Sequence, residues 1–180
     1  LEPENAESYR NRAWFYYKKK DYNKSLIDFN KAKELDPDNA LRYYHIGYVY
    51  DEGLKDYDKA LAYYKKSLEV DSTYADAINA KALIYVEQKK YDLAIKEYSK
   101  GIALKEINPN GAAYCYQNRA KQYARLREYD KALADYDSAV VLEPENALMY
   151  FSRAYFNFKV MQNLAEAEKD YKKAIDLDDY

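Results

Sequence analysis

The chain has 180 residues, of which 33% are charged, and its formal net charge at pH 7 is −2. Because acidic and basic residues nearly balance, the composition argues against a nucleic-acid-binding surface. The single cysteine, Cys115, excludes an intrachain disulfide and is compatible with a reducing, cytoplasmic compartment. No apolar run reaches the length of a membrane span, so we expect no membrane insertion.

Several segments of the chain are near-copies of one another, as Tyr9–Ala13, Tyr116–Ala120 and Tyr150–Ala154 show. Each copy ends in a small residue, and these residues belong to a row with spacings of 34, 35, 38 and 34. The row consists of Ala13, Gly47, Ala82, Ala120 and Ala154. Two further rows keep its register: Ser25, Ala60, Ala94, Ala132 and Ala167, then Ala32, Ser67, Gly101, Ala139 and Ala174. Such a period indicates an array of similar structural units.

In chain order, the period predicts repeats at residues 6–39, 40–74, 75–112, 113–146 and 147–180. Apolar residues recur at intervals of three and four, as Tyr9, Ala13 and Tyr16 do, which indicates amphipathic helices. Residues 1–5 have the same sequence as residues 142–146, which close the fourth repeat. We therefore expect residues 1–5 to be the tail of a preceding repeat, and the chain to be a fragment of a longer array.

The rows of small and aromatic residues, with prolines Pro37 and Pro144 at repeat ends, resemble the tetratricopeptide repeat family over residues 6–180. The resemblance implies an all-α fold, a single continuous solenoid of five helix-turn-helix units in a right-handed superhelix. The glycine common at the family's turn is absent, and its places hold Lys20, Lys55, Lys89, Arg127 and Gln162. A cation there can still favour the C-terminal end of a helix.

Tyrosine is unusually abundant, with 24 residues, and most of them recur at fixed places of the repeat, where we expect them to pack between helices. By the resemblance, the first helix of each unit lines a concave groove, and further rings there would form a contact surface. Alternatively, these rings stack on one another between adjacent repeats. The expected peptide-binding groove consists of Arg10, Asn11, Trp14, Tyr17, Tyr44, His45, Tyr48, Leu83, Tyr114, Gln117, Asn118, Lys121, Arg125, Phe151 and Tyr155.

Two positions of the repeat change together from one unit to the next. Four units hold a basic and an acidic residue there, separated by sixteen or seventeen positions. These pairs are Arg12 with Asp28, Lys81 with Glu97, Arg119 with Asp135, and Arg153 with Asp170. The second unit holds the uncharged Ile46 and Tyr63 instead. The pattern predicts a salt bridge between the two helices of each charged unit, with bidentate geometry for arginine. The alternative is that the arginines bind a ligand.

The sequence does not indicate catalysis. The only histidine, His45, and the only cysteine, Cys115, lie in different repeats, so no nucleophile–base set can be built from them. Metal-ligand spacing of His and Cys is absent, and so is a glycine-rich phosphate loop. We therefore expect a protein that is not an enzyme and that needs no metal or cofactor.

Two ligand-binding modes known in the family were compared with this sequence. One subclass grips a C-terminal carboxylate with lysine, asparagine and arginine residues, and neither possible register matches it. The first register gives Arg10, Trp14, His45, Asp76 and Ala80, and the second gives Asn79, Leu83, Asn118, Leu148 and Ser152. Another subclass holds a peptide backbone with a ladder of asparagines, of which only Asn11 and Asn118 are present here.

The leading hypothesis is a protein-interaction scaffold that holds a peptide segment or helix of an unidentified protein partner in its groove. The alternative is a structural spacer that assembles end to end through exposed terminal repeats. Apolar residues such as Phe156, Val160 and Ile175 are expected to be bare at the C-terminal side.

Overall fold

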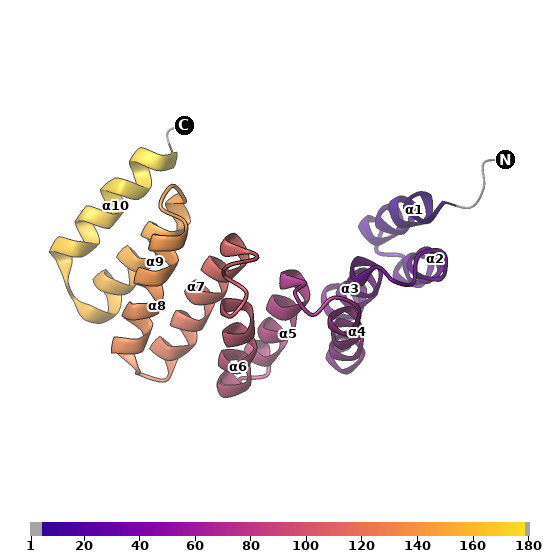
Figure 1. Ribbon diagram of the computed structural model, residues 1–180, viewed down its shortest axis with the longest axis horizontal. Coiled ribbons are helices and arrows are strands. Elements are labelled where there is room, and N and C mark those ends of the chain that lie inside the picture. The colour runs from indigo at the N-terminus through magenta and orange to yellow at the C-terminus, as the bar shows by residue number, and fades with distance from the viewer. Residues whose placement is uncertain (1–4, 179–180) are drawn as a thin grey trace. The chain divides into compact units, whose positions relative to one another are not determined.

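The computed structural model describes residues 5–178, which form ten α-helices and contain no strand (Figure 1). The helices are α1 (Ala6–Lys18), α2 (Tyr22–Leu35), α3 (Ala40–Tyr48), α4 (Tyr57–Val70), α5 (Ala75–Glu87), α6 (Tyr91–Ile102), α7 (Pro109–Arg125), α8 (Tyr129–Leu142), α9 (Ala147–Phe156) and α10 (Leu164–Asp178). The predicted all-α fold of paired helices is confirmed. Of the predicted tail at residues 1–5, all but Asn5 lies outside the described residues.

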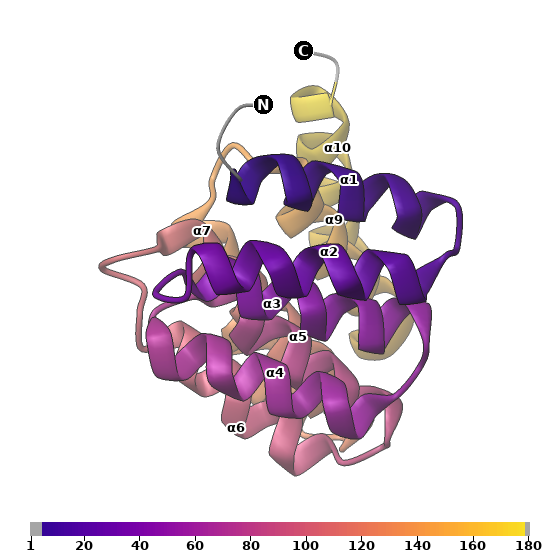
Figure 2. The same ribbon diagram turned by 90° about the vertical axis from the view of Figure 1, so that its right-hand side faces the viewer.

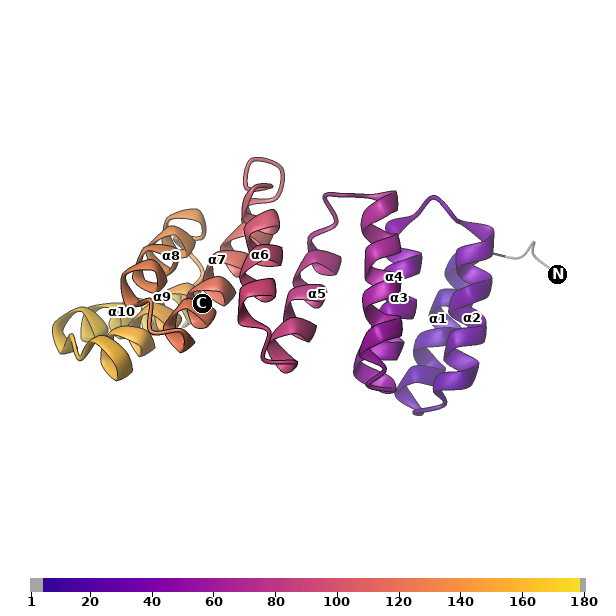
Figure 3. The ribbon, with the colours of Figure 1, turned by 90° about the horizontal axis from the view of Figure 1, so that it is seen from below.

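The chain divides into two compact units, Leu1–Ile84 and Tyr85–Tyr180. In the first unit, α1 packs against α2, α2 against α3, and α3 against α4. Figure 2 shows α1 and α2 running across the view one below the other. Helix α5 contributes Ala77 and Ala80 to a core that it shares with Tyr64 of α4. In the second unit, each helix from α6 to α10 packs against the next one, and Figure 3 shows α8, α9 and α10 in this order.

All fifteen members of the three small-residue rows are buried. They lie where two helices approach closely, and the interior has no room for larger side chains there. Gly47 illustrates the constraint, because a Cβ atom at this position would come within 2.7 Å of the ring of Tyr64.

Polar residues at the helix starts satisfy backbone groups that the helices leave free. Asn5, Asp21, Asn39 and Asn146 each accept a hydrogen bond from a backbone N–H in the first turn of the helix that follows. Helix α7 combines a cap from Asn108 with a proline at its first position. These local signals fix where the helices begin.

Two first helices continue into a π-helical turn, α3 into η1 (Val49–Gly53) and α9 into η2 (Asn157–Met161). The repeats concerned have one extra residue, since thirteen positions separate Gly47 from Ala60 whereas twelve separate Ala13 from Ser25. The wider turn accommodates the extra residue, and the N–H of Leu54 donates to the carbonyl of Val49 over 3.0 Å.

The five residues that replace the family's turn glycine all adopt left-handed backbone conformations. The φ angles are 61° at Lys20, 54° at Lys55, 57° at Lys89, 62° at Arg127 and 55° at Gln162. Glycine is favoured in this region because it has no Cβ atom. Each turn therefore keeps the left-handed conformation that glycine favours, although a residue with a side chain occupies the position.

Three of the predicted inter-helix salt bridges are confirmed. Each arginine donates two hydrogen bonds, one to each carboxylate oxygen of its partner. The donor–acceptor distances are 2.7 and 2.8 Å for Arg12–Asp28, 2.8 and 2.8 Å for Arg119–Asp135, and 2.7 and 2.7 Å for Arg153–Asp170. Lys81 and Glu97 belong to different units, and their pairing stays a prediction.

The near-identical sequence strings also have a structural explanation. The tyrosine that opens each string packs against the arginine three residues later, at 5.4 Å for Tyr9 with Arg12 and 5.5 Å for Tyr116 with Arg119. Tyr150 and Arg153 repeat the arrangement at 5.9 Å. The strings thus encode a tyrosine–arginine–carboxylate contact that joins two helices.

The expectation that Phe156 is bare at the C-terminal side is wrong. It is 2% exposed, and its ring lies 5.2 Å from that of Tyr136 in a core shared with Ala120 and Ala132. Val160 and Ile175 are exposed, as expected.

Candidate functional site

Helices α1 and α3 of the N-terminal unit carry four aromatic rings that contact one another. We call this group, Trp14, Tyr17, Tyr44 and Tyr48, the ring row. Trp14 lies 5.4 Å from Tyr17 and 5.5 Å from Tyr48, and Tyr44 lies 6.3 Å from Tyr48. All four side chains are half-buried. The rings therefore contact one another edge-on or at a tilt, including between α1 and α3, and do not stack face to face as the alternative expected; they still expose part of their surface.

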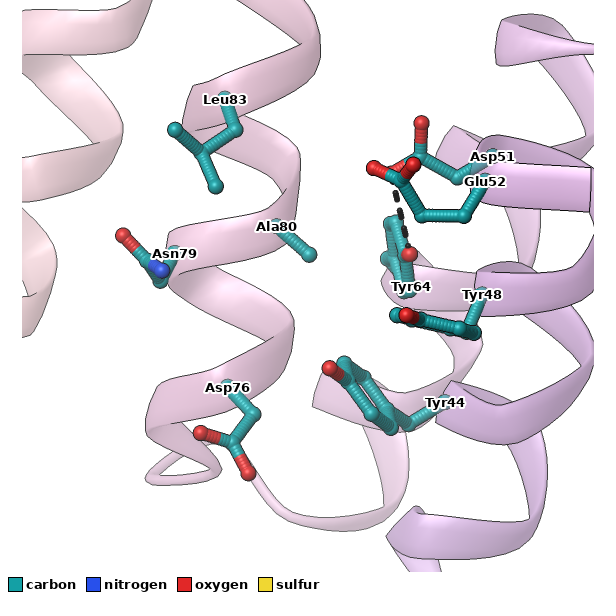
Figure 4. A pocket seen from close by; sticks show the side chains of 9 residues that line it. All are labelled: Tyr44, Tyr48, Asp51, Glu52, Tyr64, Asp76, Asn79, Ala80 and Leu83. Atoms are coloured by element: carbon teal, nitrogen blue, oxygen red, sulfur yellow. Dashed lines mark hydrogen bonds between the residues drawn. The ribbon is translucent and has the colours of Figure 1, made fainter. Parts of the chain in front are cut away.

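Beside Tyr44 and Tyr48 lies a small pocket of about 100 Å³, called here the acidic pocket (Figure 4). It is lined by Tyr44, Tyr48, Asp51, Glu52, Tyr64, Asp76, Asn79, Ala80 and Leu83. Figure 4 shows Asp51 and Glu52 on one side, beside the tyrosines, and Asp76 on the facing helix α5. Helix α3 supplies the two half-buried tyrosines, and η1 supplies the adjacent carboxylates.

The polar groups of this pocket differ in how far they are buried. Asp51 is only 8% exposed and accepts a hydrogen bond of 3.2 Å from the hydroxyl of the fully buried Tyr64. Glu52 is exposed and forms a salt bridge of 2.9 Å with Lys55 at the rim. Burial, followed by the charge of Asp76, raises the pKa of Tyr44 to about 12. The pocket therefore combines tyrosines with carboxylates.

Arg10 and Asn11 of the predicted groove lie on α1 and contact each other. Arg10 donates to the side-chain oxygen of Asn11 over 3.1 Å and forms a salt bridge of 2.6 Å with Glu7. Leu83, on α5, is 43% exposed and lines the acidic pocket.

In the C-terminal unit, the predicted groove residues Tyr114, Phe151 and Tyr155 are exposed. The remaining polar side chains are partly engaged with neighbours. Lys121 donates to Asn118 over 3.2 Å, and Arg125 donates to Gln122 over 2.7 Å. Burial, and then the charge of Arg125, lowers the pKa of Lys121.

Two residues expected in the groove are buried, and this part of the site prediction needs correction. His45 is 6% exposed, with its ring centroid 5.2 Å from that of Trp14 and 5.1 Å from that of Phe29. Burial lowers the pKa of His45 to about 4. Gln117 is 3% exposed and donates to the hydroxyl of Ser152 over 2.5 Å. Both contribute to packing and are not accessible to a partner.

The acidic side of the pocket was not part of the predicted groove. Asp51 and Glu52 follow the first helix of their repeat and reach the pocket through the π-helical turn η1. The extra residue in this repeat was the available signal, but its structural effect cannot be read from spacing alone. The sequence places Asp76 only at one position of the carboxylate-binding set, which this chain does not match.

Residues 5–178 contain no group of three or more His, Cys, Asp or Glu side chains placed to hold a metal ion. None of the helices in that range combines the length and apolar character that a membrane span requires.

Paired helices with buried small-residue rows and a half-exposed row of rings define a helical-repeat protein-interaction scaffold. Sequence models of the tetratricopeptide repeat match residues 6–39, 40–74, 75–108 and 118–180. The chain therefore belongs to the tetratricopeptide repeat family.

Curated relatives contain this repeat array within longer proteins. The chain is 30% identical to RNA polymerase II-associated protein 3 of Mus musculus, over 91% of this chain and 26% of the relative. It is 31% identical to stress-induced-phosphoprotein 1 of Caenorhabditis elegans, over 81% of this chain and 54% of the relative. The Hsp70-Hsp90 organising protein of Plasmodium falciparum is 28% identical, over 89% of this chain and 27% of the relative. The chain thus spans about a quarter to a half of these proteins.

Solved structures support the fold. The structure of pilF from Pseudomonas aeruginosa superposes with a TM-score of 0.76 at 17% identity, over 95% of this chain and 75% of that one. The crystal structure of MamA gives a TM-score of 0.69 at 24% identity, over 93% and 94% of the two chains.

Proposed function

We propose that this chain is a non-catalytic scaffold that binds a peptide segment or a helix of a partner protein through the accessible residues of the predicted groove on its N-terminal unit. The observation that carries the proposal is the ring row, which offers aromatic surface beside a pocket with polar walls. Such a combination suits a peptide, because rings supply apolar contact while carboxylates and amides orient the ligand. The similarity to the Hsp70-Hsp90 organising protein, which is named for two other proteins, supports a role in protein binding.

The ring row also supplies the readout for a binding experiment, because Trp14 is the only tryptophan in the chain. A phage-displayed library of random dodecapeptides is selected against the whole chain, and the selected peptides are titrated while tryptophan emission is followed. We expect binding to change the emission of Trp14, and Tyr48→Ala to weaken binding about tenfold.

Phe15→Ala is the matched control, because Phe15 is a 53% exposed ring on the same helix as Trp14 and is not part of the ring row. Circular dichroism verifies that both variants keep their helices. Equal affinity of Tyr48→Ala and the unaltered chain would place the binding surface elsewhere.

End-to-end assembly is the second candidate, and a hollow on the C-terminal unit favours it. This hollow of about 460 Å³ lies on α9 and α10, and its mostly apolar lining includes Leu148, Phe151 and Ile175. A second copy of the chain could cover this surface. Sedimentation velocity at increasing concentration tests the idea, with Ile175→Glu as the disrupting variant. A monomer at all concentrations would contradict self-assembly.

A further inference from the structure

We propose that the acidic pocket binds a basic side chain, preferably arginine, from the partner segment. This inference rests on the proposed function, since the segment would lie along the ring row and extend this side chain into the pocket. It adds a selectivity for positive charge that the ring row alone does not provide.

The charge of the pocket lining is the first argument. Of its nine residues, three are acidic and none is basic. Asp51 is almost fully buried, where the charged form of a carboxylate is costly unless a cation lies close to it. Asp76 and Glu52 are exposed at the edges; Asp76 can meet an incoming cation before it loses its water, and Glu52 can exchange Lys55 for it.

The placement of the carboxylates is the second argument. Asp51 and Glu52 come from η1, whereas Asp76 comes from α5 on the facing side (Figure 4). A cation between them would interact with both walls. The planar guanidinium of arginine suits this position because its five N–H donors point in several directions, whereas lysine presents a compact, strongly hydrated charge.

Aromatic faces are the third argument. Tyr44 and Tyr48, whose ring centroids are 6.3 Å apart, line the pocket and are half-buried, whereas Tyr64 is fully buried. Tyrosine faces attract cations, and the interaction strengthens where water is excluded. The rings also offer a flat surface on which a guanidinium can stack.

The chain itself uses the same combination of groups elsewhere. Arg119 pairs with both carboxylate oxygens of Asp135, while its guanidinium lies 5.5 Å from the ring centre of Tyr116 and 5.6 Å from that of Tyr123. An arginine is thus held between tyrosines and a carboxylate inside the C-terminal unit. The acidic pocket presents tyrosines and carboxylates together, so it offers an arginine from a partner the same two kinds of group.

The test uses two libraries of nonapeptides that are random except at the central position. That position is arginine in one library and citrulline, its neutral isostere, in the other. Both are passed over the immobilised whole chain and the bound peptide is quantified. We expect about tenfold more of the arginine library to be retained, and the difference to shrink as sodium chloride is raised.

Variants then locate the selectivity. The double variant Glu52→Gln, Asp76→Asn removes two exposed charges with little change in shape and keeps Asp51, so it is expected to reduce the preference for arginine. Asp58→Asn, an equally conservative change at an exposed site on α4 outside the pocket, is the control and should keep it.

The outcomes separate the two proposals. If both libraries bind equally, or if the preference for arginine is unchanged in the double variant, the peptide groove stands and the basic-side-chain pocket is refuted. If neither library binds, the groove itself is refuted and the inference falls with it.

Discussion

The inter-helix salt bridges predict a graded response to the loss of their carboxylates. The three pairs have nearly the same bidentate geometry, but their arginines differ in exposure. The side chain of Arg119 is 17% exposed and that of Arg153 is 19% exposed, whereas that of Arg12 is 57% exposed. Removing the carboxylate leaves a largely buried cation unpaired in the case of Arg119, whereas Arg153 keeps a second salt bridge, with Asp137, and Arg12 is exposed to water.

Asp135→Ala is the most informative of these changes. Arg119 would lose two charge-assisted hydrogen bonds in a site that admits little water, and breaking one partner of such a buried pair costs about 3 kcal/mol or more. The hydroxyl of Ser99 would still accept one hydrogen bond from it, and the flanking tyrosines would remain. We expect both Asp170→Ala and Asp28→Ala to be less destabilising, because Arg153 keeps its salt bridge of 2.8 Å with Asp137 and water can hydrate Arg12.

Urea unfolding followed by circular dichroism measures these differences, with the exposed Glu145→Ala as a control. A double variant, Arg119→Met with Asp135→Leu, should recover most of the loss, because it removes both charges from the site. The reasoning would be refuted if Asp135→Ala and Glu145→Ala gave the same free energy of unfolding, or if Asp28→Ala were as damaging as Asp135→Ala.

Three further predictions follow from single residues. Lys20→Gly should stabilise the chain by up to about 1 kcal/mol, because the residue has a φ of 61°, and Lys20→Val should destabilise it; thermal unfolding decides. His45 is held neutral in the fold, with its pKa lowered to about 4 from an ordinary value near 6.5. The unfolded chain therefore binds a proton that the folded chain does not. The free energy of unfolding should therefore fall by about 3 kcal/mol between pH 6.5 and pH 4 because of His45. Urea unfolding at both pH values measures this decrease, and in the variant His45→Phe the decrease should be smaller by that amount. Burial raises the pKa of the Cys115 thiol to about 11, so a thiol reagent should react slowly with the folded chain and fast in urea; rapid labelling without urea would contradict this.

Features set by the period of the repeat could be predicted from the sequence. A small residue at a fixed place is buried because two helices approach there, and the comparison of one unit with another located the arginine–carboxylate pairs. The comparison of repeat units could not reveal the left-handed backbone conformation at Lys20 and Arg127, because lysine and arginine have no preference for that conformation. The position of His45 in the repeat predicted that its side chain lies in the groove. The side chain is instead buried, because the rings of Trp14 and Phe29 pack around it.

The proposed role of the acidic pocket depends on an irregularity of the repeat and not on its period. The extra residue of the second predicted repeat is accommodated by the π-helical turn η1, which carries Asp51 and Glu52 to the edge of the ring row. π-helical turns of this kind are frequent at functional sites, because they depart from the geometry that packing alone would select. The fifth predicted repeat also has an extra residue, but its turn η2 carries Phe158, Lys159 and Val160. The two turns therefore have similar geometry and opposite chemical character, so any selectivity for positive charge would belong to the N-terminal unit.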